Sequence, residues 1–248
     1  MSPSRRIAFI TGVLFLITYV TSIAAVLLFQ PVLDDPAGYI AGAGADDRIV
    51  FGSVLELLLI IANIGTAVVL YPILKRQSEI LSLGYVAARI MECVFILFGI
   101  LAVLAVVTLG QDALGADATA LGEIGYALAA IKDWTFILGP GFVVGVGNGL
   151  LLGYLMWRSR LVPRQMAILG LIGGPLICLS GIAVMFDVFE PSGVGQAIAT
   201  IPEFFWELSL GIWLTFKGFT PSPLAAEHDA DLAAQAAVPG PPRMDPVR

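Results

Sequence analysis

The chain alternates between long apolar runs and short polar segments, and this alternation predicts its architecture. A transmembrane helix requires roughly 20 consecutive, mostly apolar residues. A backbone in lipid must also satisfy its hydrogen bonds internally, which excludes an open sheet. The sequence therefore predicts an all-α, polytopic membrane protein with six transmembrane helices. Their predicted ranges are 7–29, 49–74, 80–109, 134–157, 165–186 and 197–216.

The composition supports this class and divides the chain in two. Of the 248 residues, 58% are hydrophobic and only 13% are charged, whereas soluble domains carry about 25% charged residues. The first run follows Arg5 and Arg6, as a secretory signal would, but it exceeds the roughly 7–15 apolar residues of a signal peptide. We expect it to be a retained span. The six-helix domain is predicted over 1–219, and the Ala- and Pro-rich segment 220–248 is predicted to be a disordered cytoplasmic tail.

Basic residues predict the orientation of these spans. Ten of the 13 Lys and Arg residues fall on one side of the predicted membrane, Arg48 and Lys132 fall on the other, and Arg89 lies within span three. Because basic residues concentrate in cytoplasmic loops, both termini are predicted to be cytoplasmic, in an inner (plasma) membrane. The two long outer connections cover 30–48 and 110–133, and a short surface helix is expected near 121–131.

Glycines in the fourth run indicate a close helix contact. Small residues spaced four apart lie on one face of a helix and let another backbone approach. A bend is also expected at residues 139–141, because Pro140 cannot donate a helical hydrogen bond. The predicted helix-packing residues are Gly141, Gly145, Gly149 and Gly153.

Polar side chains inside the predicted spans are the candidate ligand-binding residues. A charge at the centre of the bilayer costs roughly 2.5–3.5 kcal/mol on insertion scales, so each one needs a partner or water. Arg89 and Glu92 are three residues apart on one helix face and are expected to pair. Glu203 and Glu207 are four apart, so one should be protonated or paired with Arg89. The full candidate set is Glu56, Asn63, Arg89, Glu92, Asn148, Glu203 and Glu207.

Two main interpretations of this set stay open, besides a third in which the carboxylates face water and share no common site. Counted along each span, the charges should form one cluster that is reached from outside, with one base against four acids. Such a cluster could be a structural network that fixes helix register. It could also be a pocket for protons, for a polar or cationic ligand, or for a lipid headgroup.

The sequence favours no metal, cofactor or catalytic group. The only histidine, His228, lies in the predicted tail, so a His-based metal centre and a His-activated nucleophile are not expected. Residues 42–47 read GAGADD but lack the strand and helix of a dinucleotide loop. Membrane lipids are the expected partners and nucleic acid is not. The sequence does not decide whether the chain forms an oligomer.

Several segments resemble a bacterial membrane family known as domain of unknown function 4386. The resemblance covers roughly residues 5–219, and its strongest strings are YVAARIMECVFILFG, LLGYLMWRSRLVPRQMAILGLIGGPL and EFFWELSLGIWLTFKGF. The matching polar positions are Arg89, Glu92, Glu207 and the loop 158–164. The resemblance implies a similar number of spans and no particular reaction.

Three functional hypotheses follow. The first is binding or transport of a small ligand at the Arg/Glu cluster. The second is a non-catalytic assembly or regulatory subunit that packs through the glycine face. The third is an intramembrane enzyme with a carboxylate as general acid or base, in which Arg89 is the only candidate electrophile-stabilising group. A non-enzymatic role is favoured over an enzymatic one.

Overall fold

The computed structural model describes residues 1–43, 46–112 and 118–237, and this part of the chain is helical throughout apart from its turns and bends. Six helices are long and apolar enough to cross a membrane. The prediction of an all-α, six-span protein is therefore confirmed, and the chain is a multi-pass membrane protein.

The spans extend beyond the predicted runs. The first three are α1 (Pro3–Asp34), α3 (Asp46–Leu74) and α4 (Glu79–Asp112), and the last two are α7 (Arg164–Met185) and α8 (Val194–Phe216). The fourth is one continuous segment of α5 (Ala118–Phe136), η2 (Ile137–Val143), η3 (Gly145–Leu152) and α6 (Gly153–Ser159). The remaining elements are α2 (Pro36–Gly38), η1 (Tyr39–Ala43) and α9 (Pro223–Ala237).

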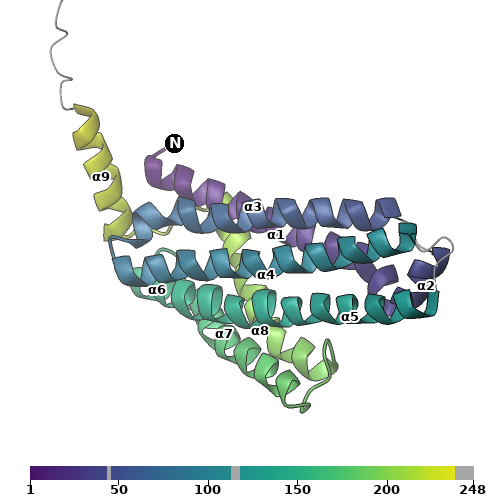
Figure 1. Cartoon of the computed structure of the whole chain (residues 1–248). Coiled ribbons are helices and arrows are strands. Elements are labelled where there is room, and N and C mark those ends of the chain that lie inside the picture. The colour runs from purple at the N-terminus through teal and green to yellow at the C-terminus, as the bar shows by residue number, and fades with distance from the viewer. Residues whose placement is uncertain (44–45, 113–117, 238–248) are drawn as a thin grey trace, which may run out of the picture.

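The six spans form a ring in the order of the sequence. Each span packs against the next one along the chain, and α8 packs against α1, which closes the ring. Figure 1 shows α3, α4 and α5 side by side, while α7 and α8 diverge from them. We call the end of the bundle that carries α9 the α9 end and the opposite one the α2 end. With six spans, the first helix begins and the last one finishes at the α9 end (Figure 1).

Two apolar clusters fill the ring near its ends. At the α9 end, side chains such as Phe15, Tyr85 and Trp206 are fully buried together. At the α2 end, Phe29 and Val103 belong to a second cluster with η1. The buried charged side chains of the spans lie in a polar layer between these clusters, whose neighbours include Phe15 and Phe29.

The fourth span corrects the prediction for residues 110–133. Instead of a loop with a short surface helix, α5 begins at Ala118 and runs without a break into η2. No Gly–Pro pair interrupts residues 118–136, and buried Ala129 lies on this extension. As a result Lys132, assigned to an outer loop from the sequence, is a buried residue of the bundle.

The segment after the last span is also more ordered than expected over Pro223–Ala237, which forms α9. Ala is the strongest helix former, and this preference outweighs the polar composition that suggested disorder. Asp229 accepts hydrogen bonds from the backbone N–H and the hydroxyl of Ser4, each at 2.7 Å. Arg76 pairs with Asp231 at 2.6 Å.

The only histidine of the chain also lies in α9. Burial lowers the pKa of His228, and this shift favours the neutral form of its imidazole. Residues 238–248 of the predicted tail lie outside the described residues.

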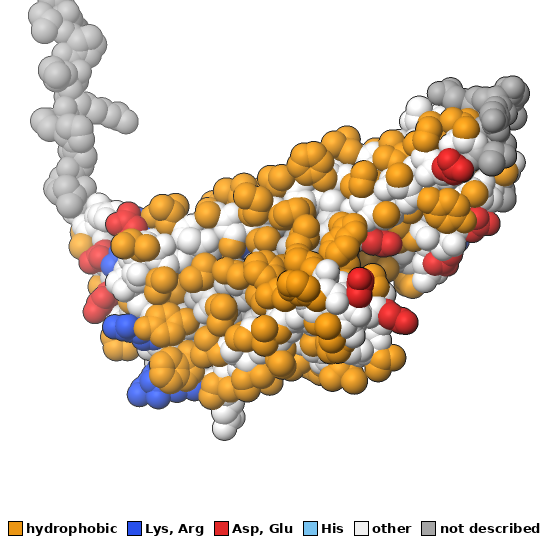
Figure 2. Space-filling view, turned by 60° about the horizontal axis from the view of Figure 1, so that its bottom comes forward, with side chains coloured by type: hydrophobic (Ala, Val, Ile, Leu, Met, Phe, Trp, Pro, Cys, Tyr) orange, Lys and Arg blue, Asp and Glu red, His pale blue; other side chains and the backbone are white. Residues whose placement is uncertain are grey.

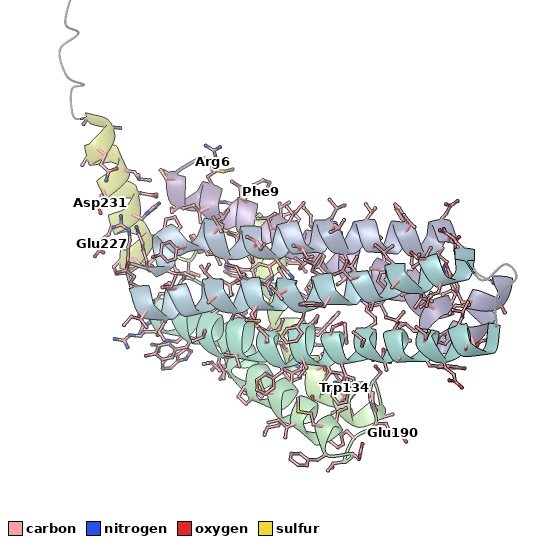
Figure 3. All side chains as sticks on the ribbon, in the orientation of Figure 1. Arg6, Phe9, Trp134, Glu190, Glu227 and Asp231 are labelled. Carbon is pink, nitrogen blue, oxygen red and sulfur yellow. The ribbon has the colours of Figure 1, made fainter. Side chains whose placement is uncertain are left out.

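Charges separate along the bundle. On the face shown in Figure 2, Lys and Arg gather towards the α9 end, and hydrophobic side chains cover the flank. Figure 3 shows Arg6 at the same end as Glu227 and Asp231, whereas Glu190 lies in the turn between α7 and α8. This segregation matches the bias that predicts an α9 end in the cytoplasm.

Reporter fusions test that orientation. We expect alkaline phosphatase to be active when it is fused after Glu190 and inactive after Arg248, because the enzyme matures only outside the bacterial cytoplasm. A fluorescent protein at the same two positions should give the opposite pattern and serves as the control. Phosphatase activity in the fusion after Arg248 would contradict the predicted orientation and place the C-terminus outside the cytoplasm.

Candidate functional site

A closed hydrogen-bonded triad joins α3 to α4 in the polar layer. Arg89 donates to Glu92 Oε2 at 2.7 Å and to Asn63 Oδ1 at 2.7 Å. Asn63 Nδ2 donates to Glu92 Oε1 at 2.9 Å, which completes the triangle. The predicted pairing of Arg89 with Glu92 is thus confirmed. All three side chains are buried, and the guanidinium also lies 5.7 Å from the centre of the Phe15 ring, so Arg89 faces the interior of the bundle.

A second ion pair joins α3 to α5. Lys132 Nζ contacts both carboxylate oxygens of Glu56, at 2.6 and 2.7 Å. The ammonium also lies 4.8 Å from the centre of the Phe29 ring. The sequence-based count of one base against four acids is therefore wrong, since Lys132 is a second buried base. Two features of the sequence could have revealed Lys132. The residues before Trp134 are compatible with a helix, and Glu56 had no assigned partner.

The two acids of α8 have a different environment. Glu207 accepts a hydrogen bond from Asn148 Nδ2 of η3. Among the described residues, neither oxygen of buried Glu203 has a hydrogen-bond partner. No Lys or Arg in the described part of the chain forms an ion pair with either acid. Of the two predicted alternatives, a pair with Arg89 does not form, because its terminal nitrogens are engaged by Glu92 and Asn63. Protonation of one of the two acids stays a prediction.

Glycines make room for Glu203 and bring the helices together. A Cβ atom on Gly149 would lie 2.3 Å from the Gly174 Cα atom and 2.8 Å from Glu203 Oε2. A Cβ atom on Gly173 of α7 would also meet Glu203 Oε2 at 2.8 Å. The fourth span at Gly149 and α8 at Gly173 therefore approach α7 closely only with glycine at these positions. Only the smallest residues let two membrane helices pack with their backbones in contact.

The predicted glycine face is only partly in that contact. Gly145 and Gly153 also face α7, with added Cβ atoms 2.6 Å from the Gly174 oxygen and 3.3 Å from the Leu171 nitrogen. A Cβ atom on Gly141 would meet only the Phe136 oxygen, at 3.5 Å. Gly141 lies in η2, where the helix takes a wider π-helical form around Pro140. Gly141 therefore does not take part in the close contact with α7.

A cavity of about 340 Å³ lies inside the ring beside these charges. All six spans contribute to its wall, and aromatic side chains such as Tyr19, Phe136 and Phe204 cover much of it. Of the seven candidate residues, six line it: Glu56, Asn63, Arg89, Glu92, Glu203 and Glu207. Asn148 does not line the cavity, but its side-chain amide donates a hydrogen bond to Glu207.

Within the described residues, no group of three or more His, Cys, Asp and Glu side chains could hold a metal ion. The cavity therefore presents the carboxyl groups of Glu203 and Glu207, which have no basic partner in the described structure. Beside them lie two ion pairs whose charges are already compensated. Tyr19 adds a hydroxyl that donates to the Phe204 carbonyl, and its ring packs edge-on against Phe204 at 5.1 Å. Tyr19 and Lys132 are the site residues that the sequence did not reveal.

Comparison with known protein families gives a match over most of the chain. The family model described as "Domain of unknown function (DUF4386)" matches residues 10–218. No curated protein and no solved structure matches the chain.

The glycine contact can be tested by adding a single methyl group. Gly149→Ala should lower the free energy of unfolding by about 1–3 kcal/mol, because overpacking displaces α7. Gly141→Ala is the matched control, and we expect it to change stability by less than about 0.5 kcal/mol. Unfolding in mixed detergent micelles, followed by circular dichroism, measures both. Equal effects of the two substitutions would contradict the assigned contact.

The buried pair of Lys132 and Glu56 can be tested in the same way. Lys132→Met leaves the carboxylate buried without a partner and should cost about 3–5 kcal/mol. The double variant Lys132→Met/Glu56→Met should recover most of this loss, since an apolar pair needs no compensation. Lys75→Met on the exposed surface is the control. If Lys132→Met is as stable as Lys75→Met, Lys132 does not lie inside the bundle.

Proposed function

The chain belongs to the DUF4386 family, whose model covers most of its length, and we propose that it binds a positively charged ligand in the cavity inside the ring. One observation carries the proposal. Glu203 and Glu207 are two neighbouring acids on the cavity wall without a basic partner among the described residues. A buried acid that ionises needs a compensating charge, and a cation in the cavity supplies it.

The other charges of the layer support this division of roles. Arg89 with Glu92, and Lys132 with Glu56, are neutral pairs with short hydrogen bonds. They account for the structural interpretation of the cluster and need no ligand. The acids of α8 are left without such a pair, so the polar layer, with Lys132 counted, carries two more acids than bases.

Aromatic side chains make the cavity suitable for an organic cation. Tyr19, Phe136 and Phe204 line the cavity, and the faces of aromatic rings attract cations, most strongly where water is excluded. An ammonium group would therefore meet both carboxylates and rings. The location that we propose is the inner membrane, with both termini in the cytoplasm.

The alternative hypotheses have less support. An intramembrane enzyme would need Arg89 as an electrophile-stabilising group, but both terminal nitrogens of Arg89 are engaged by Asn63 and Glu92. An assembly subunit would use the glycine face of the fourth span, but Gly145, Gly149 and Gly153 already pack against α7 of the same chain. Neither alternative explains the acids of α8.

The charge of Glu207 provides the test. Benzyltrimethylammonium should bind to the purified protein, and Glu207→Gln should weaken this binding about tenfold or more, because a contact with a buried charge is lost. Gln keeps the oxygen that accepts from Asn148, so the fold should survive. Equilibrium dialysis measures the binding, and a thermal shift gives an independent readout.

Two controls accompany this experiment. Glu79→Gln removes a charge from an exposed position at the start of α4 and should leave the affinity unchanged, and benzenesulfonate should not bind. Binding that is equal in wild type and Glu207→Gln would overturn the proposal. If the cation does not bind but acidification causes Glu207-dependent proton uptake, the ligand is a proton instead.

A further inference from the structure

A second hollow continues from the cavity towards the flank of the bundle. This cleft has a volume of about 440 Å³ and lies between η2, α7 and α8. It shares Phe136, Pro140, Ile177, Thr200 and Phe204 with the cavity. The two hollows therefore adjoin each other at these side chains, and the acids line the inner one.

The wall of the cleft is apolar and faces the membrane. Phe136, Ile201, Phe204 and Phe205 line it and are each at least 40% exposed, although they belong to membrane spans. The few polar groups are satisfied locally. Gln196 accepts from the Ser192 N–H at 2.7 Å, and the Thr200 hydroxyl donates to the Gln196 carbonyl at 2.9 Å. Such a wall offers room for a chain or ring and few polar contacts.

The side of the ring is open because α1 and α8 contact each other over only part of their length. Gly12 packs against Thr215, Gly211 against Phe15, and Tyr19 against Phe204. Beyond Tyr19, towards the α2 end, Ile23 and Leu27 line the cavity and are about half exposed. The divergence of α7 and α8 from the other spans in Figure 1 fits this opening.

Apolar side chains occupy both ends of the ring in the described structure. The cluster of Phe15, Tyr85 and Trp206 lies at the α9 end. The cluster around Phe29 and Val103 lies between α1, α3 and α4 at the α2 end. These clusters favour a route to the acids from the open side of the ring, where lipid surrounds the protein.

From this geometry we infer that the ligand is an amphipathic cation that enters from the membrane. Its cationic group lies against Glu207 and Glu203, and its apolar chain or ring system lies in the cleft. This inference rests on the proposed function and adds the class of ligand and its route. Charge complementarity at the acids and the adjacency of the two hollows support this occupant. Their volumes are in the range of sites for drug-sized molecules, roughly 300–1,000 Å³.

Gly141 provides a way to block the cleft without disturbing the acids. It lines the cleft, and an added Cβ atom would have only the Phe136 oxygen within 4 Å. Gly141→Leu therefore fills the cleft at a position with free space. Ala197→Phe fills it from α8, where Ala197 also lines the cleft. Leu179→Phe adds volume on the outward face of α7, at an exposed residue, and is the control.

The experiment compares a long and a short cation with the same charged group. Binding of decyltrimethylammonium and of benzyltrimethylammonium is measured by equilibrium dialysis on protein in phosphatidylcholine nanodiscs, and binding to empty nanodiscs is subtracted. We expect Gly141→Leu and Ala197→Phe to weaken decyltrimethylammonium binding about tenfold, because the chain loses its place in the cleft. The benzyl compound should change less than about twofold, and Leu179→Phe should change neither.

The outcomes separate this inference from the proposed function. If Glu207→Gln weakens both cations but neither cleft variant affects the decyl compound, the route and ligand class are wrong and cation binding stands. If neither cation binds above empty nanodiscs, both proposals fail. If n-decanol displaces decyltrimethylammonium as well as unlabelled cation does, the cleft binds apolar chains alone and the inference is overturned. Melting temperatures of the variants identify any that do not fold, and the second cleft variant then decides.

Discussion

A charge surrounded by hydrocarbon must have a partner, and this constraint organises the interior of the protein. It explains why Arg89, Glu92 and Asn63 close a triangle between α3 and α4. It also explains why Lys132 reaches Glu56 across the bundle. Once these groups are satisfied, Glu203 and Glu207 remain as acids without a base in the described structure. The need of a buried charge for a partner therefore explains both the ion pairs of the polar layer and the availability of Glu203 and Glu207 for a cation.

Shape and charge depend on the same glycines. Gly149 and Gly173 leave space for the Glu203 carboxylate, so the contact that holds the fourth span against α7 also fixes an acid of the cavity. Gly141, next to Pro140, takes no part in this close contact and lines the cleft instead. One segment of the fourth span therefore supplies both the packed glycines and part of the wall of the cleft.

Much of the site was predictable because membrane spans leave few polar residues to choose from. The pair of Arg89 and Glu92 followed from helical spacing alone, and six of the seven candidates line one cavity. The position of Lys132 was not predictable, because the length of the fourth helix depends on packing against α2 and α4. The same holds for α9, where Ala-rich helix propensity and contacts with Ser4 and Arg76 outweigh a polar composition.

The sequence by itself determined the number of spans, the helical class and the identity of the residues that lipid cannot accommodate alone, because these depend on local composition and spacing. Only the tertiary structure decided which acid meets which base, since partners such as Glu56 and Lys132 are distant in the chain. It also decided where the ring stays open. The opening depends on how far the glycine contacts between α1 and α8 extend. The sequence of one helix does not determine this length, because it depends on how the surfaces of both helices fit together.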